Sequence, residues 1–445
     1  MELFDFIEKS PEAYHTVMTL EEEFSRCGFR RLKENEIWKL ETGGKYYVVR
    51  GDTSLFAFQI PANWKGGFHI VAAHTDSPAF KVKENPEITV ENHYVKLDVE
   101  KYGGMLIAPW FDRPLSVAGR VMLKKGTSCE SRLYNADRDL LVIPNLAIHM
   151  NRKANDGYTY QVSKDLCPLF AQKGSIREMI AEELGVSVED ILGTDLYLYN
   201  RMKGTVLGMN GEFIAAPRLD DLQCVYAAMK AFLSASSDMG EKKASSAAAT
   251  AEGPVKLFGA FDSEEVGSGT RQGAGSDFLY SVLRRISESM GKTEVDYHKI
   301  LADSFLISAD NAHGVHPNFP EKADEKNRPY LNGGIVIKYN GSGKYITDSV
   351  SASVFKLLCE RAGVSYQEYF NHSDIAGGST LGHIAAQRVS VRGVDIGLAE
   401  LAMHSPYETA GARDTEDLIK VLELFYRGNF REKEKEENGV SVYSI

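Results

Sequence analysis

Five short segments of the sequence place histidine or carboxylate side chains beside apolar runs that are typical of strands. They are His74-Thr75-Asp76, Asp220-Asp221, Glu264-Glu265, Asp310 and His404. Imidazole nitrogen and carboxylate oxygen suit zinc, manganese or cobalt. Either aspartate of the adjacent pair can bridge two cations, which such sites hold about 3.5–4 Å apart. We therefore interpret the five segments together as a dinuclear metal site with an acid–base group beside it.

In two of these segments, neighbouring side chains can have different roles, one binding metal and the other orienting the ligand or transferring a proton. Asp76 faces the same side of an extended chain as His74, so its carboxylate can orient a metal-bound imidazole. Glu264 and Glu265 follow an apolar run, where one carboxylate can bind metal while the other takes a proton from the attacking water. Each segment alone is also typical of a strand end or an acidic turn, so the interpretation depends on their combination.

The elements that position these residues indicate an α/β fold. Residues 68–73, 255–261, 305–309 and 389–396 are short, mainly apolar runs that predict buried strands, and Ser10 to Gly28 favours an amphipathic helix. From about Asn92 to Asn210, alternating apolar residues and glycine pairs favour a separate β-rich domain. Residues 234–253 are small and polar, which predicts a surface loop or a frayed helix end.

Length and composition exclude several classes of protein. The chain has 445 residues, 43% of them hydrophobic and 25% charged, which is ordinary for a globular protein of two or three domains. Its net charge of −11 disfavours nucleic acid or an anionic membrane as a partner. The five cysteines are scattered without paired spacing, and no apolar run is long enough to cross a bilayer. We therefore expect a soluble cytoplasmic protein.

Several motifs closely resemble those of the aspartyl aminopeptidases, a family of cytosolic zinc metallopeptidases. The motifs are AAHTDSP, IPNLAIH, PRLDD, FDSEEVGS, SADNAHGVHPN, VIK, GGSTLGH and LAMHS. The resemblance extends over nearly the whole chain, which makes it far more specific than any single histidine motif. We take family membership as the working prediction.

The resemblance implies two divalent metal ions, with zinc as the first choice and manganese or cobalt as alternatives. The implied ligands are His74, Asp220, Glu265, Asp310 and His404. In this scheme Asp220 bridges the ions, His74 and Asp310 complete one ligand set, and the other two ligands complete the second. Glu264 is implied as the general base, and Asp76 is implied to orient His74.

The resemblance also implies three substrate-binding residues, His149, His313 and Lys338. His149 matches a histidine that reaches into the active site of a partner subunit, where it can hydrogen-bond the oxyanion. Lys338 matches a lysine near the pocket for the first side chain of the peptide, where an ammonium favours aspartate or glutamate. His313 is placed near the substrate.

The implied fold is a zinc-peptidase (phosphorylase/hydrolase-like) catalytic domain with an inserted β-rich dimerisation domain. We predict that residues 1–92 and 211–445 form the catalytic domain and that residues 93–210 form the insertion. No implied ligand lies between Asp76 and Asp220, so both flanking parts must join to build the site. A homo-oligomer, a dodecamer built from dimers, is implied as well.

The sequence thus predicts an enzyme, a dinuclear-metal aminopeptidase that removes N-terminal aspartate or glutamate from peptides. One alternative is an aminopeptidase of broader specificity with the same metals. A second is a non-catalytic scaffold with a peptidase fold. The scaffold is disfavoured because the candidate base Glu264 and all five implied ligands are present.

Overall fold

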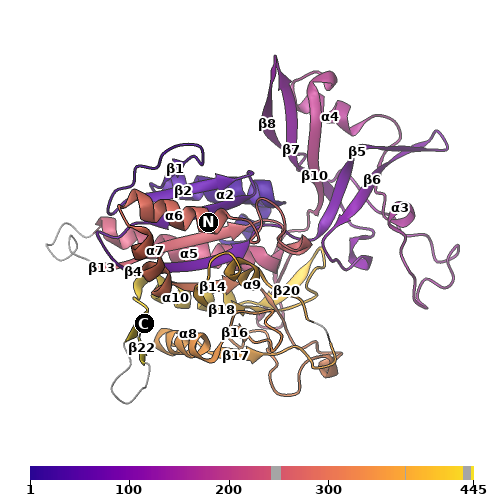
Figure 1. Cartoon of the computed structure of the whole chain (residues 1–445). Coiled ribbons are helices and arrows are strands. Elements are labelled where there is room, and N and C mark those ends of the chain that lie inside the picture. The colour runs from indigo at the N-terminus through magenta and orange to yellow at the C-terminus, as the bar shows by residue number, and fades with distance from the viewer. Residues whose placement is uncertain (242–251, 376, 434–441, 445) are drawn as a thin grey trace.

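The larger body of the molecule is built around a nine-stranded mixed sheet, seen in the computed structural model of Figure 1. The structure describes residues 1–241, 252–375, 377–433 and 442–444. In sheet order the strands are β1 (Arg30–Leu32), β2 (Lys45–Arg50), β3 (Ser54–Gln59), β13 (Glu252–Phe261), β4 (Asn63–His74), β14 (Phe305–Ala309), β18 (Arg392–Gly397), β16 (Ile335–Lys338) and β17 (Tyr366–Tyr369).

The four central strands, β13, β4, β14 and β18, run parallel, so their carboxyl ends meet at one edge. The apolar runs predicted as strands at 68–73, 255–261 and 305–309 lie in β4, β13 and β14. The run predicted at 389–396 starts too early, because β18 begins at Arg392. Val389 and Val391 are buried by packing without joining the strand ladder, which explains why they look like strand residues in the sequence.

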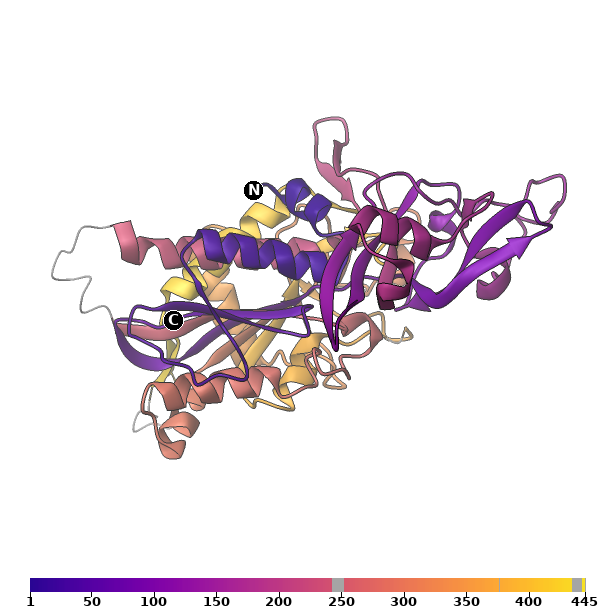
Figure 2. The same cartoon turned by 90° about the horizontal axis from the view of Figure 1, so that it is seen from above.

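Helices cover both faces of this sheet, which gives the α/β architecture expected from the sequence (Figure 2). One face carries α1 (Leu3–Lys9), α2 (Ala13–Arg26), α5 (Leu219–Glu241), α8 (Ser349–Ala362) and α10 (Asp414–Arg427). The other face carries α6 (Phe278–Ser289), α7 (Glu294–Ala302) and α9 (Leu381–Ala386). The predicted helix from Ser10 to Gly28 is α2, and the polar segment at 234–253 continues α5 to Glu241 before it leaves the described residues.

A six-stranded antiparallel sheet stands apart from this body in Figure 1 and has its own apolar core. Its strands in order are β8 (Ser128–Asn135), β7 (Leu115–Lys125), β10 (Ile191–Asn200), β5 (Ala79–Val90), β6 (Tyr94–Tyr102) and β9 (Leu169–Ala171), with helices α3 (Val162–Asp165) and α4 (Ile176–Leu184) beside them. Strand β5 precedes residue 93 yet belongs to this sheet, because it pairs along its length with β6. The domain division itself stays a prediction.

A smaller five-stranded sheet joins segments that flank the candidate ligands. Its order is β11 (Thr205–Leu207), β12 (Phe213–Ala216), β20 (Glu408–Gly411), β19 (Ala399–Leu401) and β15 (Ala312–His313). The other elements of the described residues are the pair β21 (Arg431–Lys433) and β22 (Val442–Ser444) and the short 3-10 turns η1 (Ala108–Trp110), η2 (Val188–Asp190), η4 (Glu264–Val266) and η5 (Pro320–Lys322). Among the described residues, no helix has both the length and the apolar character needed to cross a membrane.

Candidate metal centre

The candidate ligands gather where the central parallel strands end. His74 is the last residue of β4 and pairs in register with Phe261, the last residue of β13. The turn η4, which carries Glu264 and Glu265, follows β13 closely, and Asp310 follows β14 directly. Three segments that are far apart in the sequence therefore present their side chains at one edge of the sheet.

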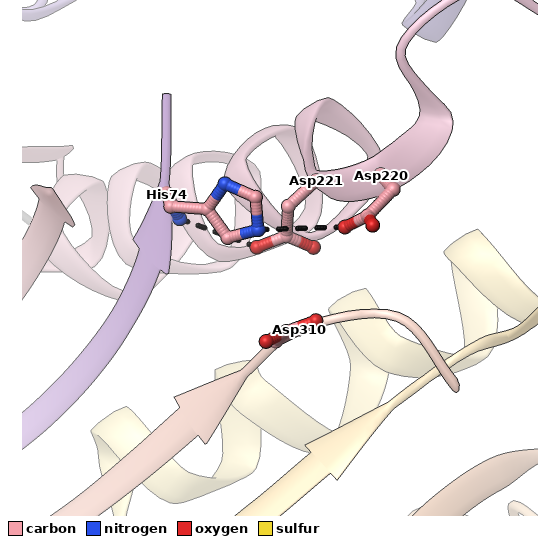
Figure 3. Close-up of side chains that lie close together, drawn as sticks. All are labelled: His74, Asp220, Asp221 and Asp310. Atoms are coloured by element: carbon pink, nitrogen blue, oxygen red, sulfur yellow. Dashed lines mark hydrogen bonds and ion pairs between the residues drawn. The ribbon is translucent and has the colours of Figure 1, made fainter. Parts of the chain in front are cut away.

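One group of four buried residues could hold a metal ion. His74, Asp220, Asp221 and Asp310 each offer a ligand atom, and these atoms lie within 4.8 Å of one another. Figure 3 shows the imidazole at the end of its strand, the two aspartates at the start of α5 and Asp310 facing them from the loop after β14. His74 Nε2 lies 3.4 Å from Asp220 Oδ1.

A second group, Asp220, Glu265 and His404, shares one member with the first. His404 Nε2 lies 3.4 Å from Asp220 Oδ2 and also 3.4 Å from Glu265 Oε2. Asp220 thus presents one oxygen to each imidazole. Asp221 has a different position, because its Oδ2 accepts the backbone N–H of His74 at 3.2 Å.

Several carboxylate oxygens in the centre have no hydrogen-bond donor. Among the described residues, Asp220 Oδ1, Asp221 Oδ1 and Glu265 Oε1 are buried without a partner. Burying an unpaired carboxylate oxygen is costly, and a cation removes that cost. The donor set, with imidazole and carboxylate groups only, fits zinc and related divalent ions.

The shifted pKa values of the acidic residues in the cluster also indicate a site for cations. Burial and the neighbouring Asp220 carboxylate raise the pKa of Glu265 well above its usual range. Burial and the charge of Asp310 raise the pKa of Glu264 to about 8. Burial also acts to raise the pKa of Asp220, but the two imidazoles of His404 and His74, each 3.4 Å away, together outweigh it and hold this pKa below its usual range. The site therefore carries more negative charge than it can accommodate without cations.

Asp76 contacts the imidazole of His74 with both its backbone and its side chain. His74 Nδ1 lies 3.0 Å from the backbone carbonyl of Asp76 and 3.5 Å from its carboxylate Oδ1. A carbonyl can only accept, so Nδ1 carries the proton and Nε2 is left to face Asp220. The Asp76 carboxylate also accepts the backbone N–H groups of Glu264 and Glu265, each at 3.1 Å.

Sequence reasoning missed Tyr102, which donates its hydroxyl to Asp76 Oδ2 at 2.8 Å. Tyr102 is the last residue of β6, so a side chain from the six-stranded sheet supports the turn that carries Glu264 and Glu265. An aromatic residue at a strand end carries no sequence signal for this contact. Glu408, four residues after His404, was missed as well, and it accepts the backbone N–H of His404 at 2.7 Å.

The three implied substrate residues occupy different surroundings. Lys338 is buried, and its Nζ donates to the carbonyl of Asn311 at 2.7 Å and lies 3.4 Å from Asp310 Oδ1. His313 borders a cavity of about 300 Å³. His149 lies in an exposed loop of the region that carries the six-stranded sheet and belongs to none of the metal-binding groups found among the described residues. The structure of one chain therefore brings Lys338 to the centre but not His149.

Comparison with known proteins places this geometry in a family. The family model described as aminopeptidase I zinc metalloprotease (M18) matches residues 6–426. A probable M18 family aminopeptidase 2 from Clostridium acetobutylicum is 43% identical, covering 95% of this chain and 97% of that protein. A protein of the same name from Pseudomonas savastanoi pv. phaseolicola is 41% identical, with coverage of 95% and 97%.

Solved structures show the same architecture. The chain matches a structure described as the Ape4 and Nbr1 complex with a TM-score of 0.90 and 33% identity, covering 96% of this chain and 84% of that one. It matches the yeast aminopeptidase 1 crystal structure with a TM-score of 0.80 and 29% identity, covering 96% and 95%. A structure described as the S. cerevisiae mApe1 dodecamer gives a TM-score of 0.81 at 29% identity, covering 96% and 95%. These likenesses confirm the predicted peptidase fold with a β-rich part.

Proposed function

Because this chain belongs to the M18 family of zinc metalloaminopeptidases, as its motifs predict, we propose that it uses two divalent metal ions to remove N-terminal aspartate or glutamate from peptides. Family membership makes the chain a metalloaminopeptidase. The number of ions, the base and the acidic preference are the proposal. The observation that carries it is the position of Asp220, whose two oxygens each lie 3.4 Å from a histidine Nε2.

In this proposal His74, Asp220 and Asp310 hold one ion, and Asp220, Glu265 and His404 hold the other. Asp220 is preferred to Asp221 as the bridge because it belongs to both groups, whereas Asp221 belongs to one. Zinc is the first choice because it is the metal of the family, and manganese or cobalt suits the same donors. When bound, the ions polarise the scissile carbonyl and lower the pKa of the attacking water.

Glu264 is proposed as the general base that takes a proton from the attacking water and passes it to the leaving amine. The backbone N–H of Glu264 donates a hydrogen bond to Asp76 Oδ1 at 3.1 Å, which fixes the direction of the Glu264 side chain. Burial and Asp310 raise its pKa to about 8 in the bare cluster. Two adjacent cations lower this value, so that the carboxylate is ionised and can accept a proton near neutral pH.

The acidic preference is proposed from Lys338. Burial opposes its charge, but the neighbouring acidic groups, Asp310 foremost among them, together outweigh burial and raise the pKa of Lys338, which keeps the ammonium charged. A buried cation beside the ligands favours a substrate with an acidic first side chain. The same contact also supports the second candidate, a broader aminopeptidase, because an ammonium 3.4 Å from Asp310 Oδ1 is partly neutralised before substrate binds.

We further propose a homo-oligomer, a dodecamer built from dimers that are joined through the predicted insertion at 93–210. Leu146, Ile148 and Met150 expose 56%, 47% and 70% of their surface around His149, and such neighbouring apolar side chains mark protein interfaces. His149 would then reach the centre of a partner subunit. All five cysteines are free, which suits a reducing cytoplasm.

The proposal is tested by stripping the purified protein of metal and measuring hydrolysis of Asp, Glu, Leu and Lys p-nitroanilides with added zinc, manganese or cobalt. An acetylated Asp substrate is the control, because an aminopeptidase requires the free amine. We expect metal-dependent release from Asp and Glu substrates above the other two. Equal release from all four would refute the acidic preference, and no release with any ion would favour the scaffold.

A further inference from the structure

We propose that Glu408 is a positioning residue that holds two metal ligands, Asp220 and His404, by their backbones. Glu408 is the first residue of β20 and is 1% exposed. Its Oε1 accepts the backbone N–H of His404 at 2.7 Å, and its Oε2 accepts the backbone N–H of Asp220 at 3.0 Å. One buried carboxylate therefore ties together two ligand segments that are far apart in the sequence. The inference rests on the dinuclear centre of the proposed function.

The backbone of both ligands departs from regular structure and needs an external partner. Asp220 lies at the start of α5 with non-helical angles, φ −80° and ψ 108°, and amides in the first turn of a helix have no acceptor within the helix. His404 has φ +66° and Ala402 has φ +59°. A residue with a Cβ atom is strained in this left-handed region. The bonds to Glu408 offset these costs.

The position of the two backbones decides where the ligand atoms lie. His404 Nε2 is 3.4 Å from both Asp220 Oδ2 and Glu265 Oε2. A small rotation of the turn at 402–405 would swing the imidazole away from both carboxylates. Glu408 itself belongs to none of the metal-binding groups in the described parts of the chain, so it acts through the residues that it holds. Loss of such supporting contacts typically weakens metal affinity by about 10- to 100-fold.

A matched control residue lies on the neighbouring strand. Glu400, on β19, is also 1% exposed, and its strand pairs with β20. Its Oε2 accepts the side-chain amide of Asn311 at 2.9 Å, and no backbone amide of a proposed ligand is among the hydrogen bonds found for it in the described residues. Glu400→Gln therefore makes the same change to a buried carboxyl group near the centre without removing a ligand contact.

The test compares wild type, E408Q and E400Q by titrating the metal-free proteins with zinc against a chelator of known affinity. In wild type we expect two bound ions. In E408Q we expect the ion assigned to Glu265 and His404 to bind about 10- to 100-fold more weakly, while the ion assigned to His74 and Asp310 is affected less. E400Q should bind both ions as wild type does. Should E408Q fail to fold, E408D gives the same comparison, because its shorter side chain cannot reach both amides.

The possible results separate the two levels of the argument. Wild-type affinity for both ions in E408Q would refute the role of Glu408 while leaving the dinuclear centre intact. An equal loss of affinity for both ions in E408Q, or the same loss of affinity in E400Q, would also refute the role of Glu408. The loss would then come from a general disturbance of the centre and not from the contacts of Glu408 with Asp220 and His404. A wild-type protein that takes up a single ion would refute the dinuclear centre and the present inference with it.

Discussion

Replacing Glu264 by glutamine separates its proposed role as a base from a role as a metal ligand. Glutamine keeps the shape of the side chain but cannot accept the proton of the attacking water. The backbone N–H of residue 264, which Asp76 Oδ1 accepts at 3.1 Å, is unchanged by the substitution. The turn and the neighbouring Glu265 should therefore keep their positions.

The size of the effect follows from what the substitution removes. A positioned acid–base group contributes about 10²–10⁴-fold to turnover, which corresponds to about 3–5 kcal/mol of barrier. Glu264 lies outside both groups that contain Asp220, so the proposed ligand sets remain complete in E264Q. We therefore expect kcat to fall by this factor while the affinity for both ions stays close to that of wild type.

The assay measures turnover of an Asp p-nitroanilide and zinc stoichiometry on the same preparation. Glu265→Gln is the matched control, because it is the same change at the next residue but removes a proposed ligand. E264Q should bind two ions and turn over slowly, whereas E265Q should lose an ion.

Two results would refute the reasoning. Near-normal turnover in E264Q would show that another group accepts the proton. Loss of an ion in E264Q would make Glu264 a ligand, a role that its closeness to His74 and Glu265 also allows.

Three further predictions concern groups around the centre. Lys338→Met should lower kcat/KM roughly tenfold for Asp and Glu substrates and little for Leu. A lysine–carboxylate ion pair is worth about 4 kcal/mol at 4 Å, but Asp310 already shares the ammonium, so the loss should be smaller than that. An equal loss of kcat/KM for all substrates would contradict a specificity role. Tyr102→Phe removes the 2.8 Å hydrogen bond from the Tyr102 hydroxyl to Asp76, and such a bond to a charged acceptor is worth about 1.5–3 kcal/mol. Zinc affinity and kcat should therefore both fall. Unchanged values would show that Asp76 does not need this hydrogen bond. After chelation, thermal stability should decrease as pH rises from about 4.5 to about 8. The pKa of Glu264 is raised from 4.5 to about 8 in the fold, so between these values the folded protein binds more protons than the unfolded chain. Scanning calorimetry in EDTA, compared with zinc-loaded protein, measures this pH dependence, and a slope of opposite sign would contradict it.

The central strands and the candidate ligands could be predicted because their signals are local. Short, mainly apolar runs mark β4, β13 and β14, and polar residues soon after such runs must lie at the sheet edge. His74, Asp310 and the pair Glu264-Glu265 are all of this kind. Their meeting in space follows from parallel pairing, which the alternation of strands and helices already indicates.

The supporting contacts could not be predicted because they depend on tertiary packing. Tyr102 reaches Asp76 only because the end of β6, from another sheet, lies beside η4. Glu408 reaches Asp220 only because β20 runs beside the segment that leads into α5. The Asp76 carboxylate was expected to orient His74, but the sequence did not indicate that it also accepts the amides of Glu264 and Glu265, or that the Asp76 backbone carbonyl is the nearer partner of the imidazole.

The most direct test of the central claim is X-ray diffraction at the zinc absorption edge from crystals of the zinc-loaded protein. We expect two anomalous peaks about 3.5–4 Å apart, with one carboxylate oxygen of Asp220 beside each. His74 and Asp310 should contact one peak, and Glu265 and His404 the other. A single peak, or two peaks bridged by Asp221, would contradict the account.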